Sequence, residues 1–191
     1  QRITIPVSFA NHRPHTDEDM AVFFDHLADI GEMVDFPPEE REKLAGFLAL
    51  WAIQPGFRVL EPGCGSGRLT EVLAPLVGFE GELLACDLSD KMLRLARARN
   101  LPAQARVVRE SVFRLGRPDA SFDRVICLNV FPHFHDPFLA LREFARLLKS
   151  GGELWINHFE GRESLNRFHR GAGAEVSHHA LPRPHTMQRL I

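Results

Sequence analysis

The sequence predicts an α/β protein built on an open, mostly parallel β-sheet with helices on both of its faces. Five short apolar runs follow one another between residues 57 and 156, and helical stretches separate them. Most of the runs are apolar without clean alternation, as expected of strands that are covered on both faces. Strands that alternate with helices along a chain favour right-handed crossovers and therefore parallel pairing.

Two helices are predicted ahead of the strands. From Thr16 onward the apolar residues recur at helical spacing, and Thr16 and Asp19 have the separation of a loose capping box. A second helix is predicted over residues 38–53, because its apolar residues share one face and Pro55-Gly56 stops it. We expect these two helices to form a cap on the sheet domain.

The strands and helices of the sheet domain are expected in alternation. The strands are FRVL (57–60), ELLAC (82–86), ARVV (105–108), DRVIC (123–127) and ELWI (153–156). The helices between them are Gly67–Leu76, Ser89–Arg99 and Pro137–Lys149. The last helix has the clearest limits, because an aspartate precedes it as N-cap, proline takes its first position and two glycines follow it.

The chain divides at the boundaries of these elements. Residues 16–54 are expected to form the N-terminal helical cap, and residues 55–160 the sheet domain. Residues 1–15 are left unassigned, except that Arg2–Phe9 would form an edge strand, because its proline cannot donate to an interior ladder. Residues 161–191 form a segment rich in His and Arg.

Composition limits the classes of function. Of the 191 residues, 45% are hydrophobic and 25% charged, and the net charge is −2, which gives no electrostatic footprint for nucleic acid. No apolar stretch approaches the roughly 18 residues that span a bilayer. Cys64, Cys86 and Cys127 lack zinc or redox spacing, which favours free thiols in a cytoplasmic protein. We expect a small-molecule partner, no nucleic acid and no membrane span, and the sequence leaves a homodimer open.

The glycine-rich turn in VLEPGCGSG (59–67) is the strongest sign of a ligand site. It lies between a predicted strand and a predicted helix, where glycines allow positive φ and let a ligand approach the backbone. A phosphate loop would end in Gly-Lys-Ser/Thr, and a dinucleotide turn would have glycine in place of Arg68. Glu61 would repel a pyrophosphate but suits a cationic ligand. The turn therefore indicates a ligand without phosphate at this point.

Polar residues also follow the next two predicted strands. Asp87 ends the second strand about 20 residues after the turn, where a carboxylate can accept both hydroxyls of a ribose. Glu110 and Ser111 follow the third strand at the same edge of the sheet. Because ligands bind open parallel sheets outside the carboxyl ends of the strands, these residues outline a nucleoside-sized ligand with a cationic end.

Four segments together resemble the class I S-adenosylmethionine-dependent methyltransferases, in particular the small-molecule branch that includes the ubiquinone and menaquinone C-methyltransferases. They are VLEPGCGSG (59–67), LLACDLSDKMLRLA (83–96), SFDRVICLNVFPHFHDP (121–137) and ALREFARLLKSGGELWI (140–156). The resemblance implies a Rossmann-like fold, S-adenosyl-L-methionine as cofactor, and in-line methyl transfer to an O, S, N or activated C atom of a small molecule. It also implies two further antiparallel strands after the fifth, which are expected to be missing from a fragment or trimmed chain.

The same resemblance implies which residues hold the cofactor. Glu61 and the glycine turn would hold the methionine moiety, and Asp87 the ribose hydroxyls. The family often has Asp where this chain has Glu110, in contact with the adenine amine. The expected set is Glu61, Gly63, Cys64, Gly65, Gly67, Asp87, Leu88, Met92, Glu110, Ser111, Val112, Leu128 and Asn129.

Catalytic residues are less tightly indicated, because the cofactor activates the methyl group and the protein mainly aligns the reactants. His133 follows the fourth strand and would act either as general base on the acceptor or, more commonly for such a histidine, as a polar rim residue. His135 and His158 are weaker candidates of the same kind. The histidines match no standard metal spacing, so no metal site is predicted.

Two alternatives to a methyltransferase stay open. One is an NAD-type oxidoreductase, which Arg68 and Glu61 disfavour, and the other is a non-catalytic cofactor-binding module or inactive fragment. In the cap, Phe23, Phe24 and Phe36 would either line an acceptor pocket or belong to the core, which is the more common role of an apolar helix stripe.

Overall fold

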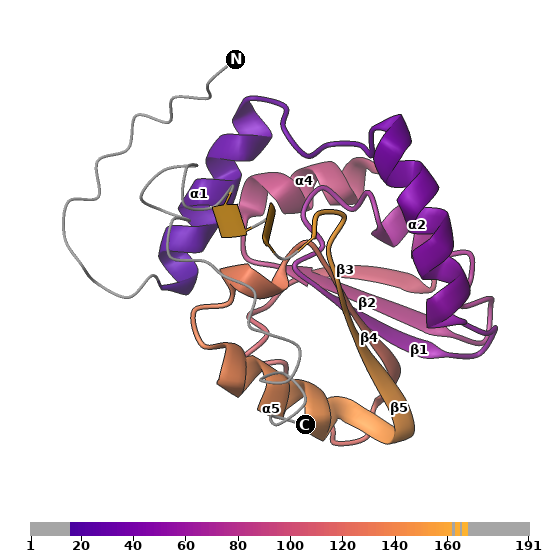
Figure 1. The fold of residues 1–191 in the computed structure, drawn as a ribbon. Helices are drawn as coiled ribbons and strands as arrows, with labels where there is room; N and C mark the ends of the chain where they lie inside the picture. The colour runs from indigo at the N-terminus through magenta and orange to yellow at the C-terminus, as the bar shows by residue number, and fades with distance from the viewer. Residues whose placement is uncertain (1–15, 162, 165, 168–191) are drawn as a thin grey trace.

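A computed structural model describes residues 16–161, 163–164 and 166–167 of the chain. Figure 1 shows one twisted sheet with helices packed around it. The elements are α1 (Asp17–Asp29), α2 (Pro38–Trp51), β1 (Arg58–Pro62), α3 (Thr70–Leu73), β2 (Glu82–Asp87), α4 (Asp90–Ala98), β3 (Ala105–Arg109), β4 (Phe122–Leu128), a 3₁₀ turn η1 (Phe131–His133), α5 (Pro137–Leu147) and β5 (Leu148–Asn157).

The five strands form one parallel sheet in the order β3-β2-β1-β4-β5. The order reverses between β1 and β4. On one side of β1 lie β2 and then β3, and on its other side lie β4 and then β5. Such a switch point leaves a crevice outside the carboxyl ends of the strands. The predicted Rossmann-like α/β fold is therefore confirmed.

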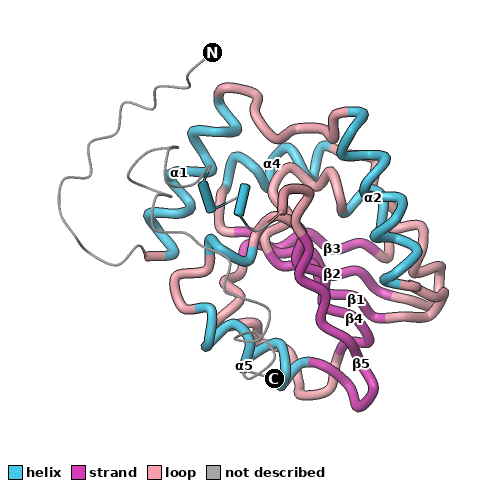
Figure 2. Tube along the Cα trace, viewed as in Figure 1, coloured by secondary structure: helices cyan, strands magenta, loops and turns pink. Residues whose placement is uncertain are grey.

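Each face of the sheet carries its own apolar core. Leu60 and Val125 point to the face covered by α5, where Phe144 packs. Val59 and Ile126, their neighbours along the strands, point to the opposite face and pack with α2 and α3. Figure 2 shows α2 and α4 on one side of the strands and α5 on the other. The three cysteines are free and buried, as the sequence predicts.

The helix expected over Gly67–Leu76 is wrong in its limits, since α3 spans only four residues. Gly67 has a φ of +76°, which is incompatible with an α-helix, so the helix begins after it. Pro75 ends the helix on the other side. The expected capping box is present: Thr16 Oγ1 accepts from the Asp19 amide, and the Asp19 carboxylate accepts from the Thr16 amide. The edge strand predicted at Arg2–Phe9 lies outside the described residues.

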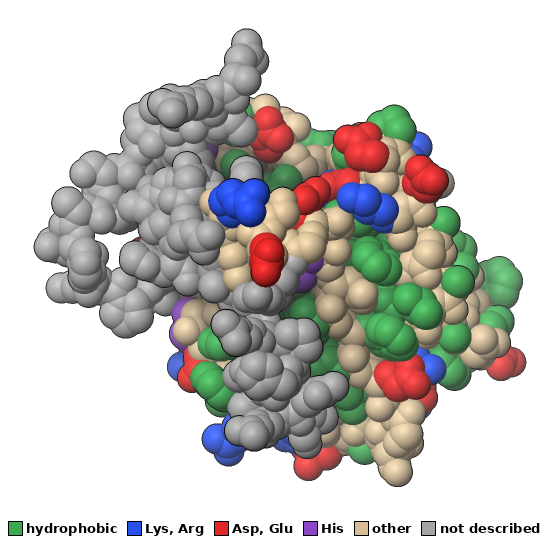
Figure 3. Space-filling view, in the orientation of Figure 1, with side chains coloured by type: hydrophobic (Ala, Val, Ile, Leu, Met, Phe, Trp, Pro, Cys, Tyr) green, Lys and Arg blue, Asp and Glu red, His purple; other side chains and the backbone are tan. Residues whose placement is uncertain are grey.

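The surface carries mixed charges on the face drawn in Figure 3, where acidic and basic side chains are interspersed over the N-terminal half of α2. Apolar side chains gather beyond the C-terminal half of that helix. Among the helices that the structure describes, none is long and apolar enough to cross a membrane.

Candidate cofactor site

A pocket opens at the switch point of the sheet, between two sets of residues that we call the pocket floor and the pocket cover. The floor comprises the lining residues at and just after the carboxyl ends of β1, β2, β3 and β4, at positions 61–66, 86–88, 110–112 and 128–130. The cover lies across it and comes from α1 and from the segment that joins α1 to α2. Its lining residues are Asp17, Met20, Ala21, Phe24, Met33 and Phe36.

The glycine turn folds closely against its neighbours. Gly63 has a φ of +67°, and a Cβ there would lie 2.2 Å from a methyl carbon of Val130. A Cβ on Gly67 would lie 2.9 Å from the Cα of Ala96 on α4. Gly65 also has a positive φ, of +53°, but no atom within 4 Å of a Cβ. The turn therefore needs glycine for its close approaches as well as for its backbone angles.

Asp87 connects the turn to the next helix. Its carboxylate accepts from the amides of Gly65 at 2.8 Å, Leu88 at 2.7 Å and Ser89 at 2.9 Å. Burial raises the pKa of this carboxyl, and the three amides oppose that shift. The acid therefore also has a structural role, because it fixes the turn and the start of α4. Its Oδ2 accepts one described hydrogen bond and keeps capacity for a ligand hydroxyl.

Glu61 lies at the base of the pocket and is 3% exposed. Its Oε2 accepts from the Thr70 hydroxyl at 2.7 Å. The pKa of Glu61 is raised to about 8: burial raises it most, the hydrogen bond from Thr70 opposes the rise, and the nearby charge of Asp87 adds to it. A buried acid of this kind gains from a cationic ligand group, which would stabilise the ionised form.

The third strand ends in residues that fit an amine donor. Glu110 lines the pocket, and its Oε1 pairs with Arg117 at 3.0 Å. Its Oε2 is buried with no hydrogen-bond partner among the described residues. An orphaned carboxylate oxygen is costly unless a donor reaches it, as the amine of an adenine would. Next to it, the Ser111 hydroxyl donates to Asp17 of the cover at 2.5 Å.

Of the residues expected to hold the cofactor, all but Gly67 line this one pocket, including Cys64, Met92, Val112, Leu128 and Asn129. Gly67 instead faces α4. Asn129 has a φ of +57°, and its Oδ1 accepts from the Phe159 amide at 3.1 Å. The Asn129 side chain thus links the loop after β4 to the segment after β5, in addition to lining the pocket.

The histidine candidates separate in the structure. His133 lines the pocket and packs edge-to-face on Phe24, with ring centroids 5.3 Å apart. His135 and His158 are not among its lining residues; His135 Nδ1 lies 2.9 Å from Asp17. Phe24 and Phe36 reach the pocket, and Phe23 packs behind on Phe24.

No group of three or more potential metal ligands occurs within the part of the chain that the structure describes. The histidines of the C-terminal segment lie outside the described residues. They are His169, His178, His179 and His185.

Sequence reasoning missed most of the cover and one side chain of the turn itself. Arg68 lines the pocket and follows the last glycine directly, so its position in the motif could have identified it. Met33 also lines the pocket, but it lies in a connecting segment that has no periodic pattern to reveal it.

The parallel sheet and the pocket at its switch point are those of an α/β protein that binds a ligand at the carboxyl ends of its strands. Residues 60–156, about half of the chain, match the family described as methyltransferase domain, and the chain therefore belongs to that family.

Similar proteins agree with this assignment. The chain is 33% identical over 114 residues to the ubiquinone biosynthesis O-methyltransferase of Xanthomonas campestris pv. campestris (strain B100), covering 58% of this chain and 46% of that protein. It is 34% identical over 136 residues to the Xanthomonas oryzae pv. oryzae (strain PXO99A) enzyme of the same name, covering 67% and 53%. The chain spans about half the length of the curated relatives it matches.

Solved structures share the fold. A SAM-dependent methyltransferase from Aquifex aeolicus superposes with a TM-score of 0.56 at 21% identity, over 72% of this chain and 88% of that one. The family match supports S-adenosylmethionine as the cofactor, as the sequence predicts.

Proposed function

We propose that this protein transfers the methyl group of S-adenosylmethionine to a small-molecule acceptor. The observation that carries the proposal is the pocket floor, where the glycine turn, Glu61, Asp87 and the orphaned oxygen of Glu110 surround one cavity. Three different strand ends thus present groups suited to an ammonium, a ribose and an amine.

The cofactor would lie along the floor in one direction. Glu61 and the turn at residues 63–66 would hold its amino-acid end, and Asp87 its ribose. Leu88 and Met92, both lining the pocket, would flank the adenine, with its amine at Glu110. When bound, the cofactor supplies a sulfonium that makes its methyl group electrophilic, so the chain's own residues have to orient the acceptor and exclude water.

The acceptor would approach from the cover. Met20, Phe24 and Phe36 provide an apolar wall that keeps water from the reacting atoms. His133, held against Phe24, is placed to take a proton from an acceptor hydroxyl. Hydroxyl acceptors are favoured because the relatives are named as O-methyltransferases.

A cytoplasmic setting belongs to the same proposal and is supported by three buried free thiols. The net charge of −2 supports a small-molecule acceptor over nucleic acid.

Calorimetry tests the cofactor. S-adenosylhomocysteine should bind and NADH should not; NADH binding without S-adenosylhomocysteine binding would favour an oxidoreductase instead. A turnover assay with S-adenosylmethionine and a panel of catechols and phenols separates an enzyme from a non-catalytic module.

The role of His133 has its own test. His133→Ala should lower the turnover rate by roughly a hundredfold, the usual contribution of a general base, while the affinity for S-adenosylhomocysteine stays the same. His133→Gln, which keeps a polar side chain but cannot take the proton, serves as the control. A rate unchanged in both variants would make His133 a rim residue.

A further inference from the structure

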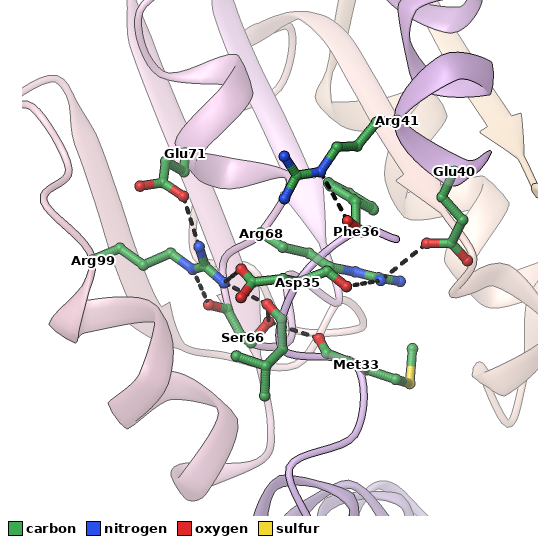
Figure 4. A network of polar contacts seen from close by, with 10 residues as sticks. Met33, Asp35, Phe36, Glu40, Arg41, Ser66, Arg68, Glu71 and Arg99 are labelled. Carbon is green, nitrogen blue, oxygen red and sulfur yellow. Dashed lines mark hydrogen bonds and ion pairs between the residues drawn. The ribbon is translucent and has the colours of Figure 1, made fainter. Parts of the chain in front are cut away.

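The segment of residues 33–36, which we call the strap, joins α1 to α2 and contributes Met33 and Phe36 to the pocket cover. It belongs to no helix or strand. Instead, each of its four carbonyl groups accepts a hydrogen bond from a side chain outside the strap, as Figure 4 shows in part. The donors are Ser66 to Met33 and Val34, Arg99 to Val34, Arg68 to Asp35 and Arg41 to Phe36.

Two of these donors belong to the glycine turn. The buried Ser66 hydroxyl lies 2.9 Å from the Met33 carbonyl and 3.0 Å from that of Val34. Arg68 donates to the Asp35 carbonyl at 3.2 Å, and its guanidinium lies 4.3 Å from the ring centroid of Phe36. The turn that would hold the cofactor's amino-acid end therefore also holds the strap.

Arg99 fastens the two segments to one another. Its Nε donates to the Ser66 carbonyl at 2.7 Å, and its Nη2 donates to the Val34 carbonyl and to the Asp35 carboxylate at 3.1 Å. Its Nη1 pairs with Glu71 at 2.6 Å. The side chain is only 14% exposed, and a planar guanidinium is the one side chain that can serve these directions together.

Arg99 itself is not among the residues that line the pocket. It reaches the turn because Gly67 has no side chain; a Cβ there would lie 3.3 Å from the Cδ of Arg99. Its effect on a ligand must therefore pass through Ser66 and the strap. Displacement of either would move Met33 and Phe36 away from the floor.

We propose that Arg99 is a positioning residue for the amino-acid end of the cofactor, because it holds the strap and the glycine turn in register. The proposal rests on the proposed function for the identity of the ligand. Its specific consequence is that Arg99 matters more at the amino-acid end of the pocket than at the ribose and adenine, whose residues lie at the ends of β2 and β3.

Two probes distinguish positioning from general stability. S-adenosylhomocysteine carries the amino-acid end, and adenosine lacks it. Arg99→Ala should weaken binding of S-adenosylhomocysteine by about tenfold, because the strap and the turn lose their common anchor, and leave adenosine binding within about twofold. Arg99→Lys keeps the charge but not the forked guanidinium. Its affinity for S-adenosylhomocysteine should lie between those of wild type and Arg99→Ala. Equal losses for both probes, or no loss for either, would overturn the proposal.

The matched control is Arg146→Ala. Arg146 is bonded as richly as Arg99, to Glu143, Asp119 and two carbonyl groups, but it lies on α5 away from the pocket. It should lower stability without changing the ratio of the two affinities.

Hydrogen exchange of the ligand-free protein tests the fastening separately from the cofactor. Amides of residues 33–36 and 63–68 should exchange faster in Arg99→Ala than in Arg146→Ala at equal global stability. If the wild-type protein does not bind S-adenosylhomocysteine, the proposed function fails, and the positioning role for that ligand fails with it. Unchanged exchange alongside normal wild-type binding would instead contradict Arg99 alone.

Discussion

The floor and the cover of the pocket are held in place by different forces. The floor continues from strands whose residues Val59, Leu60, Leu83 and Leu84 are essentially fully buried and whose backbones pair in register. In the cover, α1 buries only Met20 and Ala21. The floor is therefore fixed by the core. In contrast, α1 depends largely on individual polar side chains, and the strap on side-chain donors together with one core residue, Phe36.

The polar contacts of α1 lie at both of its ends. Asp17 accepts from Ser111, and Asp25 accepts from the Ser89 hydroxyl at 2.5 Å and from the Lys91 amide at 3.0 Å. These contacts are few and part-buried, and each is a hydrogen bond to a carboxylate, which contributes about 1.5–3 kcal/mol. The difference teaches that the cover can separate from the floor at far lower cost than the floor can deform, which suits a pocket that must admit and release a ligand.

The largest effect is expected where the floor has no room. Gly63→Ala places a Cβ 2.2 Å from Val130 on a backbone with positive φ, and should lower the free energy of unfolding by about 3 kcal/mol. Gly65→Ala has the same kind of backbone and open space, so only the strain of about 1 kcal/mol is expected. Denaturant unfolding of both variants measures the difference. Equal losses would show that the close approach to Val130 does not constrain the turn.

A smaller effect, on ligand affinity, is expected at the two carboxylates that accept hydrogen bonds from Ser89, which are Asp87 of the floor and Asp25 of α1. Asp87→Ala, on the floor, should weaken binding of S-adenosylhomocysteine by about 1–3 kcal/mol, since it would remove the proposed ribose contact and release the Gly65 amide. Asp25→Ala, on the cover, should change that affinity by less than about 1 kcal/mol. Calorimetry on both variants decides. A larger loss in Asp25→Ala would reverse the ranking of floor over cover.

The same contrast explains what the sequence could predict. The sheet, its flanking helices and the floor residues were predictable, because apolar runs, strand-end acids and a glycine turn are local patterns. The strap was not predictable: Met33 and Val34 are held through their carbonyl groups, and side chains that donate to a backbone leave no mark on the acceptor residues. In the sequence, Arg99 is simply the last residue of a predicted amphipathic helix. Only the structure, with its close packing at Gly67, shows that its side chain lies against the glycine turn.

The smallest predicted effect is a pH dependence that arises in the floor. Because burial raises the pKa of Glu61 to about 8, the folded protein keeps a proton that the unfolded chain releases above its ordinary value of 4.5. The contribution of this group to stability is therefore present at low pH and falls as the pH rises from about 5 to about 8. A cationic ligand reverses the preference, since it favours the ionised carboxylate. Binding should then release a proton, and the affinity for S-adenosylhomocysteine should rise on the order of tenfold between about pH 6 and about pH 8.

Glu61→Gln separates this effect from the other acids of the pocket, including Asp87, whose pKa burial also raises. The variant should bind more weakly at about pH 8 and show a nearly flat affinity over the range from about pH 6 to about pH 8. Calorimetry in two buffers of different ionisation enthalpy measures the released proton directly. If wild type and variant release the same number of protons, the titrating group is not Glu61, and the buried acid at the base of the turn would serve only to hold Thr70.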